Sequence, residues 1–235
     1  MGERKTSKRG RPPKEAGGDT SGAILDAAEE LFALHGFDGV TLRQVAKAAG
    51  VDVALIGYYF GAKRSLFDAV FLRRADILNQ ERLDALDRYE REAGDAMTLE
   101  GLMEAFLRPT MEPSTHRGEG WRYYFALVAQ VNNTPVWGGE TMTRYFDPVI
   151  HRLIGLVHRV MPEAAEEDVY WSYHMLSGAL TLSLGQTGRL DLLSGGLCRS
   201  DDLRAACDHL VPFAAAGFRA ACAARRAGRR PEAPA

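Results

Sequence analysis

Apolar residues recur at helical spacing along most of the chain. In the first such segment they follow at steps of three and four residues: Ile24, Leu25, Ala28, Leu31 and Phe32. Gly36 comes directly after this segment and is a typical helix stop. No segment alternates apolar and polar residues over the length of a strand, so we expect no sheet. The pattern predicts an all-α protein with a three-helix head and a longer helical body.

Two short helices are expected after the first, with a tight turn between them. Thr41 and Gln44 have the spacing of a capping box, which predicts the start of the second helix, and Gly50 predicts its end. Asp52 is placed to cap a third helix, which Gly61 breaks. Three short helices with such a turn between the second and the third have helix-turn-helix geometry.

The rest of the chain is predicted to be helical nearly throughout, with breaks at stretches rich in glycine and proline. The expected helices cover residues 62–92, 98–111, 119–132, 140–160, 166–187 and 201–226. We therefore divide the chain into a disordered basic arm at 1–20, a helix-turn-helix head at 21–67, a body at 68–227 and a disordered tail at 228–235.

The third helix has an unusual distribution of side chains. Ile56 and Phe60 lie one turn apart on one face and can pack against the head. The opposite face carries small residues such as Ala54 and Gly57, with Val53 at its tip and tyrosines at its edge. Small side chains permit a close approach to base edges, and tyrosine or lysine suits phosphate oxygens. This face predicts a helix that enters the major groove of double-stranded DNA.

Composition is that of an ordinary globular protein, with 46% hydrophobic and 26% charged residues. There is no apolar run of about 18 residues, so we expect no membrane span. The basic N-terminus is not followed by an apolar segment of the secretory type. The three cysteines lack metal-ligand spacing and suit a reducing compartment, so we expect a cytoplasmic protein.

The charge is distributed unevenly along the chain. Residues 1–14 hold six lysines or arginines and one glutamate, a net charge of +5, whereas the whole chain has −2. Arg9 and Arg11 stand in the sequence "KRGRPPK", which resembles the core of an AT-hook that lies in a narrow minor groove. The alternative is a basic tail that only improves solubility.

The segment "AILDAAEELFALHGFDGVTLRQVAKAAGVDVALIGYYFGAKRSLFDAV" resembles the DNA-binding domain of the TetR family of repressors. The resemblance rests on Gly-Phe after the first helix, Thr-Leu-Arg at the second, and Tyr-Phe-x-x-Lys-x-x-Leu leading into the fourth. It implies contacts with bases through Arg43, Val53, Ala54, Leu55 and Gly57. It implies contacts with phosphates through Thr41, Tyr58, Tyr59 and Lys63.

Some of these assignments have plainer alternatives. Tyr58 and Tyr59 would also suit packing against the fourth helix, and Arg43 would also suit a solvated helix surface. The family often has a tyrosine where this chain has Gly57. Direct readout from that position is therefore lost, which leaves more to Arg43 and to DNA shape.

The stretch "WSYHMLSGALTLSL…LVPFAAAGFRAAC" resembles the branch of the family that responds to fatty acids or their acyl-CoA esters. This implies a ligand-binding and dimerisation body and an apolar small-molecule effector, with a fatty acyl compound as one candidate. Aromatic residues are abundant in the middle helices, and polar groups such as Gln130 or Asn133 would complete a cavity. The candidate ligand-binding residues are Phe106, Tyr124, Phe125, Phe146, His174 and Met175.

Two helices carry stripes that would suit a homodimer interface. Helix 166–187 carries Val169, Tyr173, Leu176, Leu180 and Leu184. The last helix carries Leu203, Cys207, Leu210, Ala214, Gly217 and Ala221. We expect these stripes to pair with their mates as a four-helix bundle, and the alternative is burial inside the monomer.

Two functions remain open at this point. The first is a dimeric repressor that a ligand releases from a palindromic operator. The second is a helical lipid carrier or small enzyme that retains a three-helix head. No nucleophile–base pairing, phosphate-binding glycine loop or metal motif is recognisable, so we expect neither an enzyme nor a cofactor or metal. Salt-dependent, sequence-selective binding to DNA would separate the two functions.

Overall fold

The structure is a computed structural model that describes residues 19–112, 118–135 and 137–228. Across these residues every regular element is a helix, as the apolar pattern predicts, and there is no strand. Arg9, Arg11 and most of the arm and tail lie outside the described residues. The elements are α1 (Thr20–His35), α2 (Leu42–Ala49), α3 (Val53–Phe60), α4 (Lys63–Ala93), η1 (Gly94–Ala96), α5 (Leu99–Met111), α6 (Glu119–Asn132), α7 (Gly138–Val160), α8 (Glu166–Leu184), α9 (Arg189–Leu193) and α10 (Leu203–Gly228).

The boundaries of the predicted helices agree with the structure to within one helical turn, and two differences have a local cause. Helix α8 ends at Leu184 instead of residue 187, because Gly185 and Gln186 turn the chain and Gln186 adopts a φ of +43°. A short helix, α9, forms inside the segment from 188 to 200 that we expected to be a break.

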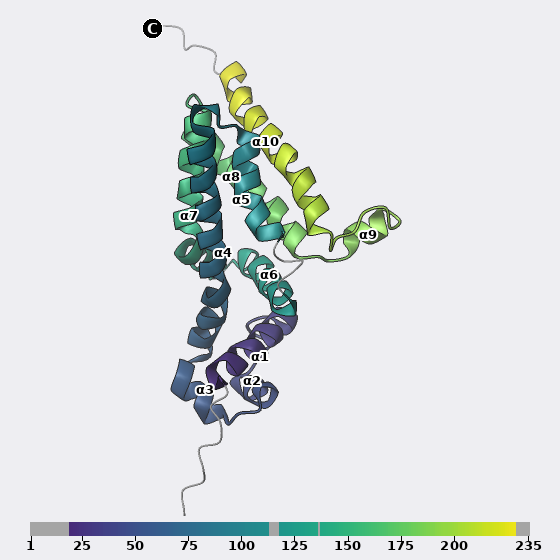
Figure 1. The fold of residues 1–235 in the computed structure, drawn as a ribbon. Coiled ribbons are helices and arrows are strands. Elements are labelled where there is room, and N and C mark those ends of the chain that lie inside the picture. Colours follow the sequence, from purple (N-terminus) through teal and green to yellow (C-terminus); the bar gives the residue numbers. More distant parts are fainter. Residues whose placement is uncertain (1–18, 113–117, 136, 229–235) are drawn as a thin grey trace, which may run out of the picture.

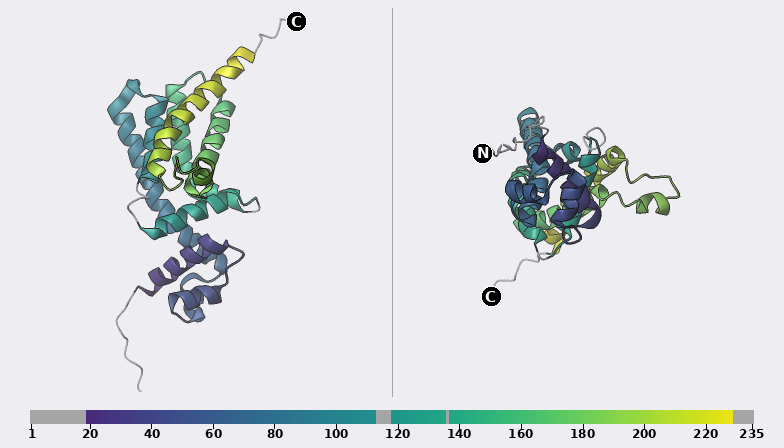
Figure 2. Two further views of the ribbon diagram at one scale, coloured as in Figure 1. Left: turned by 90° about the vertical axis from the view of Figure 1, so that its right-hand side faces the viewer. Right: turned by 90° about the horizontal axis from the view of Figure 1, so that it is seen from below.

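The molecule has a head and a body, joined by two helices (Figure 1). The head contains α1, α2 and α3. The body is an upright bundle of α5, α7, α8, α10 and the upper part of α4, which lies at one side and packs against α5 and α7. Helix α6 lies across the lower end of this bundle, between it and the head, as the side view also shows (Figure 2).

The head helices begin and end where local side chains satisfy their backbone groups. The Thr41 hydroxyl accepts a hydrogen bond from the Gln44 backbone N–H, and the Gln44 side chain accepts one from the Thr41 N–H at 2.8 Å. Gly50 ends α2 in the left-handed conformation, with φ of +67°. Asp52 then caps α3 through a 2.8 Å bond from the Ala54 N–H to Oδ1. These caps fix the tight turn of the helix-turn-helix.

Helix α4 belongs to both parts of the molecule. It runs without interruption for 31 residues. Leu66 and Phe67, near its start, are buried with Phe32 in the head core, where the rings of Phe32 and Phe67 meet edge to face. Leu78 and Leu86, further along, are buried in the body. Because α4 is continuous, any tilt of its body half is transmitted to the head.

Helix α6 provides a second connection, which the sequence did not reveal. It packs along α1 of the head. Near its C-terminal end, the Gln130 side chain donates a hydrogen bond to the Ala33 carbonyl oxygen at 2.6 Å. Trp137, just after α6, contacts the ring of Phe37 with 5.5 Å between centroids. Gln130 therefore holds the head and does not line an effector cavity, contrary to our expectation.

A buried carboxylate joins α1, α4 and α6. Glu29 of α1 is 1% exposed and accepts two hydrogen bonds from Arg74, at 2.6 and 2.7 Å, and one from Arg73 at 3.0 Å. The Arg74 guanidinium also lies over the ring of Trp121 on α6. Gly120 permits this approach, because a Cβ there would lie 2.0 Å from the Arg74 side chain. We call this group the Glu29 clamp.

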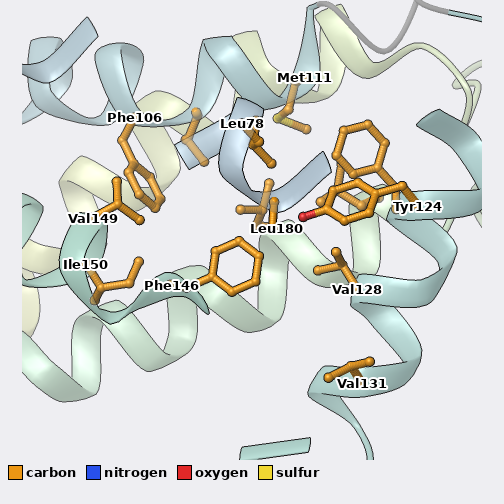
Figure 3. Close-up of a cluster of buried hydrophobic side chains, with 14 of the residues drawn as sticks. Leu78, Phe106, Met111, Tyr124, Val128, Val131, Phe146, Val149, Ile150 and Leu180 are labelled. Atoms are coloured by element: carbon orange, nitrogen blue, oxygen red, sulfur yellow. The ribbon is translucent and has the colours of Figure 1, made fainter. Parts of the chain in front are cut away.

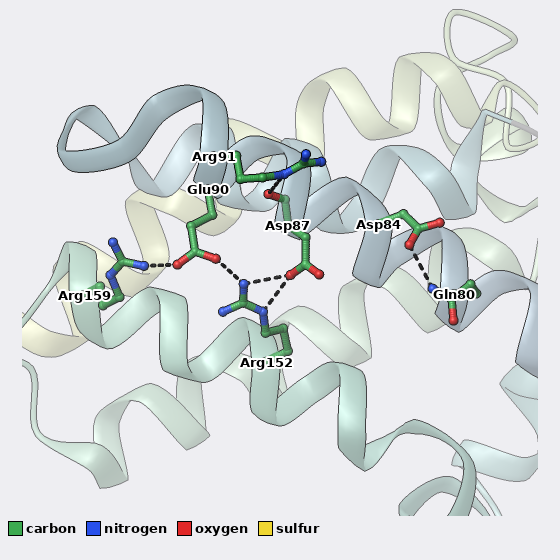
Figure 4. A network of polar contacts seen from close by, with 7 residues as sticks. All are labelled: Gln80, Asp84, Asp87, Glu90, Arg91, Arg152 and Arg159. Carbon is green, nitrogen blue, oxygen red and sulfur yellow. Dashed lines mark hydrogen bonds and ion pairs between the residues drawn. The ribbon is translucent and has the colours of Figure 1, made fainter.

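A second polar network joins α4 to α7 in the body (Figure 4). Arg152 donates to Asp87 at 2.7 and 2.9 Å and also pairs with Glu90, which Arg159 contacts from the next turns of α7. These arginines hold the pKa of the Glu90 carboxyl below its usual value. The pairs are solvent-accessible, so each contributes little to stability.

Most residues of the stripes that we expected at a dimer interface lie inside the monomer. Helix α10 packs against α5 and α8, which buries Leu203, Cys207, Leu210 and Ala214. The α8 residues Val169, Leu176, Leu180 and Leu184 are buried too. The body's own core explains the apolar character of these buried residues, so the prediction that they meet a second subunit was wrong. Gly217 and Ala221 of the α10 stripe are exposed, and for them it stays a prediction.

The Glu29 clamp gives a prediction about stability. Glu29→Gln should lower the free energy of unfolding by about 2–3 kcal/mol, because two guanidinium groups lose a buried anionic partner. The matched control is Asp26→Asn, since Asp26 also bonds Arg73 but its side chain is 71% exposed, and it should cost less than about 1 kcal/mol. Urea unfolding of both variants measures the difference, and equal losses would contradict this account.

Candidate nucleic-acid interface and internal cavity

Helix α3 exposes the face that the sequence assigned to DNA bases. Ile56 is fully buried and anchors the helix in the head core. The side chains on the other face are open to solvent, with Val53 41% and Leu55 39% exposed, and Ala54 and Gly57 beside them are exposed as well. The result is a shallow surface of small and medium apolar groups. Such a surface can approach base edges and thymine methyl groups closely.

The two tyrosines lie at the edge of this surface. Tyr58 is 81% exposed and Tyr59 is 46% exposed, and their rings meet edge to face with centroids 5.3 Å apart. Neither ring is buried against α4, so packing does not explain them. Two exposed phenol groups at the end of α3 are well placed to donate hydrogen bonds to phosphate oxygens.

The polar residues predicted to contact DNA beside α3 differ in whether they already have a partner in the protein. Arg43 is exposed and makes no ion pair or hydrogen bond with any residue that the structure describes. Thr41 is exposed, but its hydroxyl already takes part in the capping box. Lys63 is half-buried, and its ammonium lies 4.5 Å from the centroid of the Phe37 ring, a cation–π contact that positions it beside the α3 surface.

A small cavity lies in the body among α4, α5, α6, α7 and α8, with a volume of about 30 Å³. Three of the predicted ligand residues line it, namely Phe106, Phe125 and Phe146. Figure 3 shows Phe106 and Phe146 converging with aliphatic side chains such as Leu78 from different helices. The cavity holds little more than one water molecule, so a larger guest requires the surrounding helices to separate.

Three predicted ligand residues do not line this cavity. Tyr124 is fully buried next to it, with its hydroxyl directed into the same cluster (Figure 3). His174 is exposed and Met175 is 63% exposed, so both lie on the outer side of α8. Each residue turns an α-helix by about 100°, and the lining residue Tyr173 faces inward, so its two successors point away. Asn133 is exposed at the end of α6.

One buried arginine in the cavity wall is recognisable in the sequence. Arg82 lines the cavity and is 4% exposed, together with Thr110 of α5. It stands midway in the buried i, i+4 series formed by Leu78 and Leu86. An arginine at the centre of an apolar stripe is uncommon, and this position marks the cavity.

Neither a membrane-spanning helix nor a metal-binding cluster is found in the described part of the chain. None of its helices combines the length and apolarity needed to cross a membrane. Within the same residues, no three histidine, cysteine, aspartate or glutamate side chains are placed to hold a metal ion.

The head has the architecture of the helix-turn-helix class of DNA-binding domains. Residues 24–70 match the family model described as bacterial regulatory proteins of the tetR family. Residues 104–217 match the model of the tetracyclin repressor-like C-terminal domain. The chain therefore belongs to the TetR family.

Individual relatives agree with this assignment. The chain is 44% identical over 55 residues to the HTH-type transcriptional regulator RutR of Escherichia coli, which is 23% of this chain and 26% of RutR. It is 34% identical over 64 residues to the HTH-type transcriptional repressor AcnR of Corynebacterium glutamicum, covering 26% and 34% of the two chains. The matches thus span about a quarter to a third of these relatives.

The fold of the whole chain has counterparts among solved structures. One is a protein of Clostridium perfringens described as a fatty acid metabolism regulator, with a TM-score of 0.57 and 18% sequence identity. The superposition covers 83% of this chain and 97% of that protein. At this identity, the likeness establishes the shared fold.

Gly57 allows a test of the α3 surface. A Cβ at Gly57 would meet no atom within 4 Å, so Gly57→Ala should stabilise the protein by about 0.5–1 kcal/mol through helix propensity. The added methyl group projects from the α3 surface, so affinity for specific DNA should change as well. Gly155→Ala is the control, an exposed helical glycine of α7 with equally open space. It should stabilise similarly and leave DNA binding unchanged, as thermal unfolding and fluorescence anisotropy can establish.

Proposed function

We propose that this protein is a dimeric transcriptional repressor that binds double-stranded DNA through α3 and releases it when a mostly apolar small molecule binds in the body. The observation that carries the proposal is the exposed face of α3, in which small apolar groups and free tyrosines surround a capped, rigidly packed helix. A protein that only transported lipids would gain nothing from that face.

DNA recognition follows from the chemistry of this surface. Helix α3 enters the major groove, where Val53, Ala54 and Leu55 contact base edges. The Arg43 guanidinium donates a bidentate pair of hydrogen bonds to a guanine. Tyr58 and Tyr59 contact the phosphates and fix the register of the helix. The basic arm adds electrostatic affinity, through Arg9 and Arg11 in the minor groove.

The homodimer forms through the outer face of α8 and α10. This face, distinct from the buried stripes, carries exposed apolar residues, namely Tyr170, Trp171, Met175, Leu182 and Phe213. The segment around α9 lies on the same side of the body (Figure 2, left) and exposes Leu192 and Leu197 almost fully. Exposed apolar residues gathered on two neighbouring helices are typical of an interface, and an isologous dimer covers them with its own copy.

Effector binding is coupled to the head through α6. Phe125 and Val128 of this helix line the cavity, whereas Gln130 bonds Ala33 of α1 and Trp121 lies under Arg74, the partner of Glu29 on α1. A guest that enlarges the cavity must displace one of its walls, and displacement of α6 re-orients the head. The aromatic lining suits an apolar guest, and the fold shared with a described fatty acid metabolism regulator supports a fatty acyl compound.

The relatives are transcriptional regulators by name, which supports a regulatory function without catalysis for this protein. Such proteins act on chromosomal DNA, and we accordingly place this one in the cytoplasm. The lipid carrier or small enzyme predicts weak, sequence-independent DNA binding. Titration with the protein's own promoter region and with scrambled DNA at several salt concentrations distinguishes these functions.

Arg43 provides the sharpest test of sequence recognition. Arg43→Ala should cost about 1–3 kcal/mol of affinity for the specific DNA and relax discrimination at one position in each half-site. Arg204→Ala is the matched control, because Arg204 is an equally exposed arginine on α10. Anisotropy titrations with specific and scrambled DNA measure both effects. Loss of the same size for both variants, or on both DNAs, would refute base contact by Arg43.

A substitution at Phe213 tests the proposed dimer interface. Its side chain is 71% exposed on α10, so Phe213→Glu should leave the helical content unchanged but place two carboxylates in the proposed interface. Analytical ultracentrifugation should then detect monomers, and operator affinity should fall because the two heads are no longer linked. Ile77→Glu, at an exposed apolar position of α4, is the control and should remain dimeric. A dimeric Phe213→Glu variant would locate the interface elsewhere.

A further inference from the structure

Arg82 is a buried cation in the wall of the cavity. It lies on α4, 4% exposed. Its Nε donates a hydrogen bond to the Thr110 hydroxyl oxygen at 2.8 Å, and its guanidinium plane stands 4.5 Å from the centroid of the Phe106 ring. These contacts fix the orientation of the group but supply no negative charge.

No carboxylate pairs with Arg82 among the residues that the structure describes. The ionisable groups that act on it are the phenols of Tyr124 and Tyr173. Burial lowers the pKa of the Arg82 guanidinium to about 10, which still leaves it charged at neutral pH. By contrast, Arg74, Arg108 and Arg152 each bond at least one carboxylate. Arg82 is thus a buried charge with its counter-charge missing.

An unpaired buried charge is costly for a fold, and such groups cluster at binding sites. The Thr110 bond engages Nε, and no hydrogen bond from the two Nη atoms is formed within the described residues. A guanidinium offers two parallel N–H donors whose geometry matches a planar carboxylate. The geometry therefore selects an anion with two oxygens in one plane.

A second polar group near the cavity lacks a partner. The hydroxyl of Tyr124 is buried and makes no hydrogen bond with any of the described residues. Figure 3 shows it directed from α6 toward Leu180, a cavity-lining residue, in the middle of the apolar cluster. Burial raises the pKa of this phenol, so it keeps its proton and remains a hydrogen-bond donor. Arg82 and Tyr124 thus supply donors to one region from two helices.

We propose that the effector is a free carboxylic acid with an apolar body, whose carboxylate is bound by Arg82 and the Tyr124 hydroxyl inside this cavity. The inference rests on the proposed function only in taking the cavity as the effector site. The apolar body extends between Phe125 and Phe146 and separates α6 from α7. An ester or thioester of the same acid lacks the anion and does not bind.

The test measures ligand binding to the full-length protein without DNA. Thermal unfolding and isothermal titration are carried out with hexanoate, decanoate and phenylacetate, and with the methyl ester and the alcohol of each. At least one acid should stabilise the wild-type protein, whereas its ester and alcohol should not. Arg82→Met should reduce the affinity for that acid by about ten- to a hundredfold, the worth of a charged hydrogen bond.

The unfolding temperatures of the variants without ligand show whether Arg82 serves to bind a ligand or to stabilise the fold. Arg82→Met should unfold at the same temperature as the wild type or higher, because it replaces an unpaired charge with an apolar side chain of similar length. Arg74→Met is the matched control and should unfold at a lower temperature, because it breaks the Glu29 clamp. Marked destabilisation by Arg82→Met would give Arg82 a structural role and overturn the inference.

Two other outcomes would also overturn it: equal stabilisation by an acid and its ester, or no stabilisation by any of the acids. An acid that binds through Arg82 but leaves the protein on its DNA would support the inference and refute the proposed release. Equal binding of the wild-type protein to its promoter region and to scrambled DNA would refute the regulator but would leave the acid-binding result unaffected.

Discussion

The orientation of the head on the body depends on the Glu29 clamp. A carboxylate on α1 is removed from water and bonded to two adjacent arginines of α4, one of which lies on Trp121 of α6. A buried ion pair tolerates little displacement, because loss of either partner leaves an uncompensated charge. Three helices from the two parts of the molecule are therefore held in one arrangement, and the position of α3 relative to the body follows from it.

Arg74 and Arg82 lie on the same helix but differ in whether a carboxylate pairs with them. Arg74 has its carboxylate and fastens the head, whereas Arg82, two turns further along α4, has none and faces the cavity. Helix α6 contacts both regions, through Trp121 at the clamp and Phe125 at the cavity. A ligand that supplies the missing charge stabilises an expanded cavity more than the closed one. Such a difference in affinity between two states is what a shift of population requires.

The sequence predicted the head better than the body, for a physical reason. The caps by Thr41, Asp52 and the glycines act over three or four residues, so local patterns suffice to place α2 and α3 and the exposed face of α3. Faces of α8 and α10 cannot be assigned in this way, because these helices are apolar on more than one side. His174 and Met175 were placed in the cavity for that reason, although tertiary packing turns them outward. Arg82 interrupted an apolar stripe, and only the assembled body reveals that it lacks a partner.

Helix α8 lines the cavity on one side and carries part of the proposed dimer interface on the other. Tyr173 and Leu180 line the cavity, and Trp171 and Leu182 lie on the outer face. An effector could thus act within one subunit, through α6 and the head, or across the dimer, through α8. The first route is the more direct, because α6 packs closely on α1 whereas α8 makes no comparable contact with the head. In the proposed dimer, recognition of two half-sites requires heads about 34–36 Å apart, and a rotation of the head at α6 would change that spacing.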